Sequence, residues 1–114
     1  MPSAKIDSIV HAYLQALTNE GIIVEQAYLY GSQAREEAEP ESDIDLIVVS
    51  KSFTHIPAPE QWKKLGKAAL AIMEPVEVLP YTPEEVEANL KKEGGFLRHV
   101  LSRPDTVEYK VYQT

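Results

Sequence analysis

Residues 29–35 read LYGSQAR and residues 42–46 read SDIDL, and these two segments give the clearest structural signal in the chain. The first closes a run rich in β-branched and aromatic residues with a Gly-Ser pair, and the second opens a near-continuous apolar run. The first pattern is typical of a strand, and the second of a strand buried on both faces. We therefore expect strands at residues 22–30 and 43–49. The polar residues 33–38 between them are numerous enough for one or two helical turns.

The Gly-Ser pair at the end of the first strand is suited to binding an anion. Backbone N–H groups that open a helix or turn are free to donate to phosphate oxygens. Gly31 lets the backbone approach such a group closely because it has no Cβ. Ser32 adds a hydroxyl that either caps a helix or donates to a phosphate. The pair alone is equally typical of an ordinary turn, so its interpretation depends on the acidic residues downstream.

Asp43 and Asp45 stand two apart at the start of the second strand. In a strand their side chains project from the same face, with Cα atoms about 6.6 Å apart. Two carboxylates so placed repel each other unless a cation lies between them. Hard oxygen ligands of this kind suit Mg²⁺, so the pair predicts a magnesium site rather than a simple strand-entry cap.

Two further charged residues are weaker candidates for the same site. Glu77 lies in a predicted strand between Val76 and Val78, and it either joins the aspartates from a neighbouring strand, about 4.8 Å away, or faces solvent. Three acids around metal ions, beside a turn that binds phosphate, are typical of phosphoryl or nucleotidyl transfer. Arg35 either contacts phosphates or pairs with Glu39.

The remaining hydrophobic pattern predicts a small mixed α/β (α+β) fold. Helical spacing of apolar residues recurs at residues 6–17, after Pro59, after the Thr82 capping signal and at residues 96–101. A half-exposed strand is expected from residue 107 onward. The expected order, α-β-α-β-α-β-α-α-β, gives a small mixed β-sheet flanked by helices in a single domain, residues 1–114. On this pattern the only tryptophan, Trp62, belongs to the core and Lys63, Lys64 and Lys67 to an exposed helix face.

Charge and composition exclude several classes of protein. The 114 residues carry a formal net charge of -7 and contain no cysteine. All of this excess lies in residues 1–50, where nine carboxylates face only Lys5 and Arg35. Such a surface disfavours direct nucleic-acid binding and anionic membranes. No membrane-spanning run or secretory signal is visible, so a cytoplasmic location is expected. The three histidines are too widely spaced to indicate a metal site.

At the residues described above the sequence resembles a known family. Gly31-Ser32, ten intervening residues and then Asp43-Ile44-Asp45-Leu46 resemble the signature of the DNA polymerase β nucleotidyltransferase superfamily, and the short length resembles its minimal nucleotidyltransferase (MNT) branch. The resemblance implies transfer of a nucleoside monophosphate, AMP from ATP, to a hydroxyl. Many minimal members are antitoxins of HEPN-domain toxins, and some modify a tyrosine of the toxin.

The resemblance also implies a role for each candidate residue. Asp43, Asp45 and Glu77 are the catalytic and metal-binding residues, and Gly31, Ser32 and Arg35 bind the nucleotide. Mg²⁺ is the implied cofactor and ATP the implied substrate. The partners are a nucleoside triphosphate and a HEPN-domain protein, in a homo- or hetero-oligomer.

Departures from the family pattern keep other functions open. Gln33 stands where many members have arginine, Glu36 where many have glycine, and the third acid is Glu77 rather than aspartate. One alternative is an antitoxin that neutralises its partner by binding alone. Another is transfer to a small molecule such as an aminoglycoside, for which the chain has little room to form an acceptor pocket.

Overall fold

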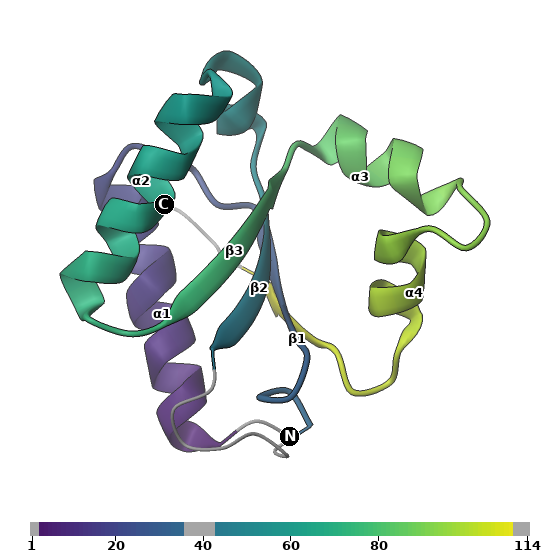
Figure 1. Cartoon of the computed structure of the whole chain (residues 1–114), viewed down its shortest axis with the longest axis horizontal. Helices are drawn as coiled ribbons and strands as arrows, with labels where there is room; N and C mark the ends of the chain where they lie inside the picture. Colours follow the sequence, from purple (N-terminus) through teal and green to yellow (C-terminus); the bar gives the residue numbers. More distant parts are fainter. Residues whose placement is uncertain (1–2, 36–42, 111–114) are drawn as a thin grey trace.

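The computed structural model describes residues 3–35 and 43–110, and it shows one sheet with helices on both faces (Figure 1). The second half of the long connection between the first two strands therefore lies outside the described residues. The elements in chain order are the helix α1 (Ala4–Asn19), the strands β1 (Gln26–Tyr30) and β2 (Ile44–Val49), the 3-10 helix η1 (Lys51–His55), the helix α2 (Ala58–Ile72), the strand β3 (Val76–Tyr81), the helices α3 (Pro83–Leu90) and α4 (Phe96–Ser102), and the strand β4 (Val107–Lys110).

The sheet is mixed, as expected, and its strand order is β3-β2-β1-β4. β1 pairs with β2 and with β4 in antiparallel orientation, whereas β2 and β3 run parallel. A parallel pair needs a crossover connection, which α2 supplies. The prediction of a small mixed β-sheet flanked by helices is therefore confirmed.

The two faces of the sheet are covered to different extents. One face packs against α1 and α2 in a large core that includes Leu29, Leu46 and Val48. The opposite face packs α4 against Ile47 and Val49 in a smaller cluster. Figure 1 shows α1 and α2 on one side of the sheet and the pair α3 and α4 on the other. Alternate residues of β2 thus point to opposite layers, as the pleat of a strand requires.

The helix ends follow the local sequence signals. Ser3 caps α1 by accepting a hydrogen bond from the Ile6 N–H at 3.2 Å, and Gly21 follows the helix with a φ of 85°. Thr82 and Glu85 form a reciprocal capping box at the start of α3, with N···O distances of 2.9 and 3.1 Å. The capping box had been expected from sequence, and it satisfies two N–H groups that the helix itself leaves free.

The first strand is shorter than the sequence pattern predicts. β1 begins at Gln26 because side chains of the segment after β2 bind the backbone of Ile23. The Ile23 N–H donates to Ser52 Oγ at 3.0 Å, and Ser50 Oγ donates to the Ile23 carbonyl at 2.5 Å. Residues 33–35, where a helical turn was expected, form a turn without helix; the rest of that stretch lies outside the described residues.

The prediction that Trp62 belongs to the core is wrong. Its side chain is 55% exposed, whereas Leu65 and Ala68 form the buried face of α2. Successive helical residues are rotated by about 100°, so Trp62 lies beside the buried stripe rather than within it. The lysines of α2 behave more nearly as expected, since Lys63 and Lys67 are exposed and half-buried Lys64 donates to the Glu20 carbonyl at 2.8 Å.

Candidate functional site

Three residues at one end of the sheet, Tyr30, Asp45 and Glu77, lie in a single row across β1, β2 and β3, which we call the acidic row. Tyr30 is the register partner of Asp45, and Asp45 is the register partner of Glu77. Register partners on neighbouring strands project to the same face. For β2 this is the face shared with Ile47 and Val49, towards α3 and α4. The structure therefore brings Asp45 and Glu77 side by side, and Asp43 precedes Asp45 by two residues along the extended chain.

Gly31 lies next to this row, and its backbone conformation and lack of a side chain allow the close contact. Its φ is 77°, which glycine adopts readily. A Cβ at this position would stand 2.6 Å from Asp45 Oδ2, which is closer than atoms can approach. The carboxylate of Asp45 therefore rests against the backbone of the Gly31-Ser32 turn. Any larger residue at position 31 would have to displace it.

The electrostatics of the row show crowding of like charges. Burial raises the pKa of Asp45, and the negative charges of Glu77 and Asp43 raise it further. Burial also raises the pKa of Tyr30 to about 12, with additional contributions from Asp45 and Glu77. Charged carboxylates that disfavour one another in this way attract a cation, which would lower the energy of their ionised forms.

The three acidic side chains do not form a closed metal cage as they stand. Within residues 3–35 and 43–110, no group of three or more His, Asp or Glu side chains is arranged to hold a metal ion. Asp45 is half-buried, whereas Asp43 and Glu77 are exposed. The chemistry of the donors still fits Mg²⁺, which keeps several water ligands and takes one or two carboxylates together with substrate phosphates.

The other two predicted nucleotide-binding residues lie beyond the end of β1. Ser32 is half-buried in the turn that follows Gly31. Arg35 is exposed, and its positive charge interacts electrostatically with Asp105 in the segment before β4. A bidentate hydrogen bond from Arg103, at 3.0 Å, lowers the pKa of Asp105, and Arg35 contributes to the same shift. The alternative partner of Arg35, Glu39, lies outside the described residues.

A family model described as a nucleotidyltransferase domain matches residues 12–110 of the sequence. This chain belongs to that family. The match spans every element from within α1 to the end of β4, so it includes the whole acidic row and the Gly31-Ser32 turn.

Two crystal structures are similar to this nucleotidyltransferase domain at low sequence identity. One is a toxin–antitoxin structure with AMP-PNP, with 23% identity and a TM-score of 0.47 over 60% of this chain. The chain covers 54% of that relative, or about half its length. The other is a Sulfolobus solfataricus protein described as a nucleotidyltransferase, with 21% identity and a TM-score of 0.47 over 84% of this chain and 95% of the relative. A comparison with curated proteins finds no match.

The nucleotidyltransferase domain also has a cavity that the sequence did not indicate. It has a volume of about 370 Å³ and adjoins Glu77 and Tyr30, so it is continuous with the acidic row. Its lining comes from both sides of β3 and from α2, and includes Trp62 and Gly66. Tyr30 was visible within the LYGSQAR segment but carried no signal of its own. Trp62 was assigned to the core, which hid its place in the cavity wall.

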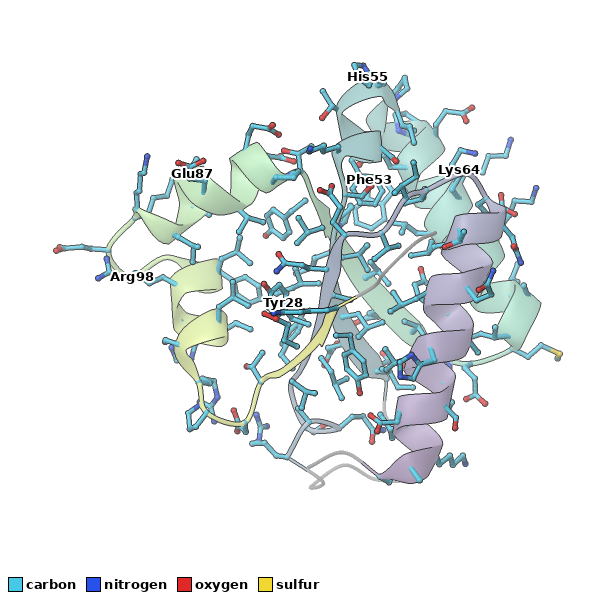
Figure 2. The ribbon with its side chains drawn as sticks, turned by 180° about the vertical axis from the view of Figure 1, so that it is seen from behind. Tyr28, Phe53, His55, Lys64, Glu87 and Arg98 are labelled. Carbon is cyan, nitrogen blue, oxygen red and sulfur yellow. The ribbon has the colours of Figure 1, made fainter. Side chains whose placement is uncertain are left out.

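The outer sides of α3 and α4 carry charged side chains that point away from the sheet (Figure 2). Figure 2 shows Glu87 and Arg98 on the outer sides of α3 and α4, and Tyr28 between the sheet and α4.

None of the helices in the described part of the chain is both long enough and apolar enough to cross a membrane.

Proposed function

We propose that this chain transfers a nucleoside monophosphate, AMP from ATP, to a hydroxyl acceptor in a Mg²⁺-dependent reaction. The observation that carries the proposal is the contact between the Asp45 carboxylate and the Gly31 backbone, in a row with Glu77 and two residues from Asp43. In this arrangement, carboxylates that attract a cation lie beside a turn whose N–H groups can bind phosphate. Membership of the nucleotidyltransferase family supports it independently.

The candidate residues have distinct parts in this reaction. The Gly31-Ser32 turn holds the β- and γ-phosphates, while Asp43 and Asp45, together with Glu77, would hold the Mg²⁺ that binds the phosphates. Glu77 accepts the proton of the attacking hydroxyl. The acceptor oxygen forms the new O–P bond at the α-phosphorus, and pyrophosphate leaves in line with the attack. Mg²⁺, when bound, neutralises the phosphate charge. Positioning of the reactants supplies a large part of the rate enhancement.

The proposed acceptor is a tyrosine of a HEPN-type toxin, which makes the chain an antitoxin. This part rests on the resemblance of the Gly31-Ser32 and Asp43-Ile44-Asp45 segments to minimal nucleotidyltransferases. The excess negative charge of residues 1–50 also suits a basic partner surface.

The test is transfer of label from ATP carrying a labelled α-phosphate, in the presence of Mg²⁺ and the co-expressed toxin. We expect label on the toxin, and a loss of at least about 100-fold in the Asp43→Asn/Asp45→Asn variant, because removing charge stabilisation at one transition-state oxygen already costs this much. Glu87→Gln is the matched control, since Glu87 is exposed on α3 and remote from the row. Absence of label with the unaltered protein would contradict the proposal.

The second candidate function is neutralisation by binding alone. It is favoured by the excess negative charge of residues 1–50, which complements a basic partner surface whether or not transfer takes place. If this candidate is correct, the Asp43→Asn/Asp45→Asn variant will still neutralise the toxin, and no label will transfer from ATP in either protein.

A further inference from the structure

The strand β3 is an edge strand of the sheet, and no strand of the described residues pairs with its outer side. The Ile44 N–H donates to the Pro75 carbonyl at 2.8 Å, and the Ser50 N–H donates to the Tyr81 carbonyl at 3.0 Å. In a parallel pair, alternate residues of a strand direct both backbone groups to the same neighbour. The residues of β3 that bond β2 are thus the odd-numbered ones. The backbone groups of Val76, Val78 and Pro80 face outward.

Only a short part of this edge is open to pairing. Pro80 has no N–H, so it can donate no bond at its outward-facing position, as is typical of protected edge strands. Lysine, another common protection, is absent from β3. The Val78 N–H and the carbonyls of Val76 and Val78 remain available, on either side of Glu77.

An apolar stripe of α2 runs beside this open edge. Trp62, Gly66 and Ala69 share a helix face at spacings of four and three residues, and all three line the 370 Å³ cavity together with Val76 and Val78. Trp62 is 55% exposed, and Met73, one turn beyond Ala69, is 87% exposed. No atom lies within 4 Å of the position that a Cβ of Gly66 would occupy, so the groove is open above this glycine.

We propose that the groove between β3 and α2 binds an extended segment of the acceptor protein, and so delivers its hydroxyl to the acidic row. Side chains of an added strand alternate between the two faces of the sheet. One side chain of the segment would therefore extend the row Tyr30, Asp45, Glu77, while its two neighbours would contact Trp62 and Gly66. The expected pattern is apolar–hydroxyl–apolar. This inference rests on the proposed function, because it identifies the acceptor of that reaction.

Charge selects this occupant over a second copy of the same chain. The open edge carries Glu77 and is preceded by half-buried Glu74, and no residue of β3 is basic. Pairing of β3 with β3 of another copy would bring these like charges together, which destabilises cross-strand pairs. A segment with lysine or arginine beside the apolar–hydroxyl–apolar stretch complements the same charges.

The transfer step that follows docking needs no reactant other than ATP and the hydroxyl of the segment. The hydroxyl oxygen of the segment bonds to the α-phosphorus of ATP, the bond from that phosphorus to the bridging oxygen breaks, and pyrophosphate departs. The hydroxyl proton passes to Glu77 and then to water.

Binding can be measured apart from transfer because Trp62 is the only tryptophan in the chain. The probe is the synthetic peptide Lys-Val-Tyr-Val-Lys-Lys, titrated to 1 mM against the full chain while tryptophan fluorescence is recorded. We expect a saturable change. A peptide with the same sequence but N-methylated at both valines and at the tyrosine should bind at least tenfold more weakly, because it lacks the N–H groups that face β3 in either strand orientation. Equal binding of the two peptides, or no fluorescence change, would overturn the inference.

The matched variants are Gly66→Gln and Ala71→Gln, both on α2. Glutamine at position 66 fills the groove and should weaken peptide binding at least tenfold, and the protein should remain folded because the site has open space and glutamine favours helix. Ala71 is exposed and does not line the cavity, so Ala71→Gln should bind the peptide normally. Equal binding by the two variants would overturn the inference.

The outcome also separates this inference from the proposed function. Peptide binding that depends on Gly66, without transfer of label from ATP, would support the groove and contradict the transferase. Transfer of label to the toxin that is unchanged in Gly66→Gln would support the transferase and overturn the groove. Uptake of ATP with Mg²⁺, measured by calorimetry, should be the same in Gly66→Gln and in the unaltered protein.

Discussion

The face of the sheet that packs against α1 and α2 buries twenty residues of the described chain in one cluster, whereas the face towards α3 and α4 buries four. At the end of the sheet next to the Gly31-Ser32 turn, the strand residues on the first face are all apolar, whereas the second face carries Tyr30, Asp45 and Glu77. Burying three such polar groups beneath a full helical layer without hydrogen-bond partners would be unfavourable. The closed face thus contains most of the buried core, and the open face carries the candidate site.

The sharpest test of this division is a pair of core truncations. Leu46→Ala, in the larger cluster, should lower the free energy of unfolding by about 3–4 kcal/mol, because it leaves a cavity in a close-packed layer. Leu97→Ala, in the smaller cluster, should cost about 2 kcal/mol, because few buried neighbours surround the site and α4 can relax. Urea denaturation measures both. A larger loss for Leu97→Ala would reverse the assignment of the two faces.

The second test separates backbone strain from crowding of the site. Gly31→Ala should cost about 1–3 kcal/mol in stability and also weaken ATP uptake, because its Cβ displaces the Asp45 carboxylate. Gly21→Ala is the control, with a similar φ of 85° and no atom near its Cβ position. It should lose stability without losing ATP uptake. Equal ATP binding by the two variants in calorimetry would show that Gly31 serves only the turn.

The Tyr13 hydroxyl links the two helices of the closed face. Tyr13 Oη donates to the Leu65 carbonyl at 3.0 Å, and this bond is buried. Tyr13→Phe should lower the free energy of unfolding by about 1 kcal/mol, a typical value for one hydrogen bond. The effect should appear in thermal denaturation, with ATP uptake unchanged. Altered ATP uptake would mean that the closed face is coupled to the site.

The smallest expected effect is a gain in the free energy of unfolding rather than a loss. Burial and the neighbouring charges of Glu77 and Asp43 raise the pKa of Asp45 in the folded protein. The unfolded chain therefore releases this proton at a lower pH, so stability falls as the pH rises from the ordinary pKa of aspartate to the raised one. Asp45→Asn should be more stable than the unaltered protein at pH 7, by less than about 1 kcal/mol because solvent screens the half-buried group.

Asp105→Asn is the control for this prediction. The hydrogen bond from Arg103 lowers the pKa of Asp105, so its ionised form favours the folded state above the ordinary pKa. The substitution should not raise stability at pH 7. Denaturation curves at pH 3 and pH 7 compare the two variants. A stability gain in Asp105→Asn equal to that in Asp45→Asn would refute the like-charge explanation.

Local sequence signals predicted much of this fold, and the failures have physical causes. The capping box at Thr82, the near-continuous apolar run of β2 and the helical spacing in α1 are encoded in neighbouring residues. The start of β1 was missed because it depends on serine hydroxyls 27 and 29 residues away. Trp62 was misplaced because the buried face of α2 is set by the packing of α1, which periodicity alone does not specify.

The candidate site was predictable in its residue types rather than in its arrangement. Asp43, Asp45 and Glu77 stood out as acids in apolar strands, but the register that sets Asp45 beside Glu77 follows from the parallel pairing of β2 and β3. The contact between Asp45 and Gly31 joins residues fourteen apart in sequence and could not be inferred from spacing. The roles of all six predicted site residues remain predictions.

Isothermal titration calorimetry of ATP, with and without Mg²⁺, tests most directly whether the acidic row binds a nucleotide. We predict saturable uptake by the unaltered protein that requires Mg²⁺ and is lost in Asp43→Asn/Asp45→Asn. Equal uptake by the two proteins, or no uptake by either, would contradict the account.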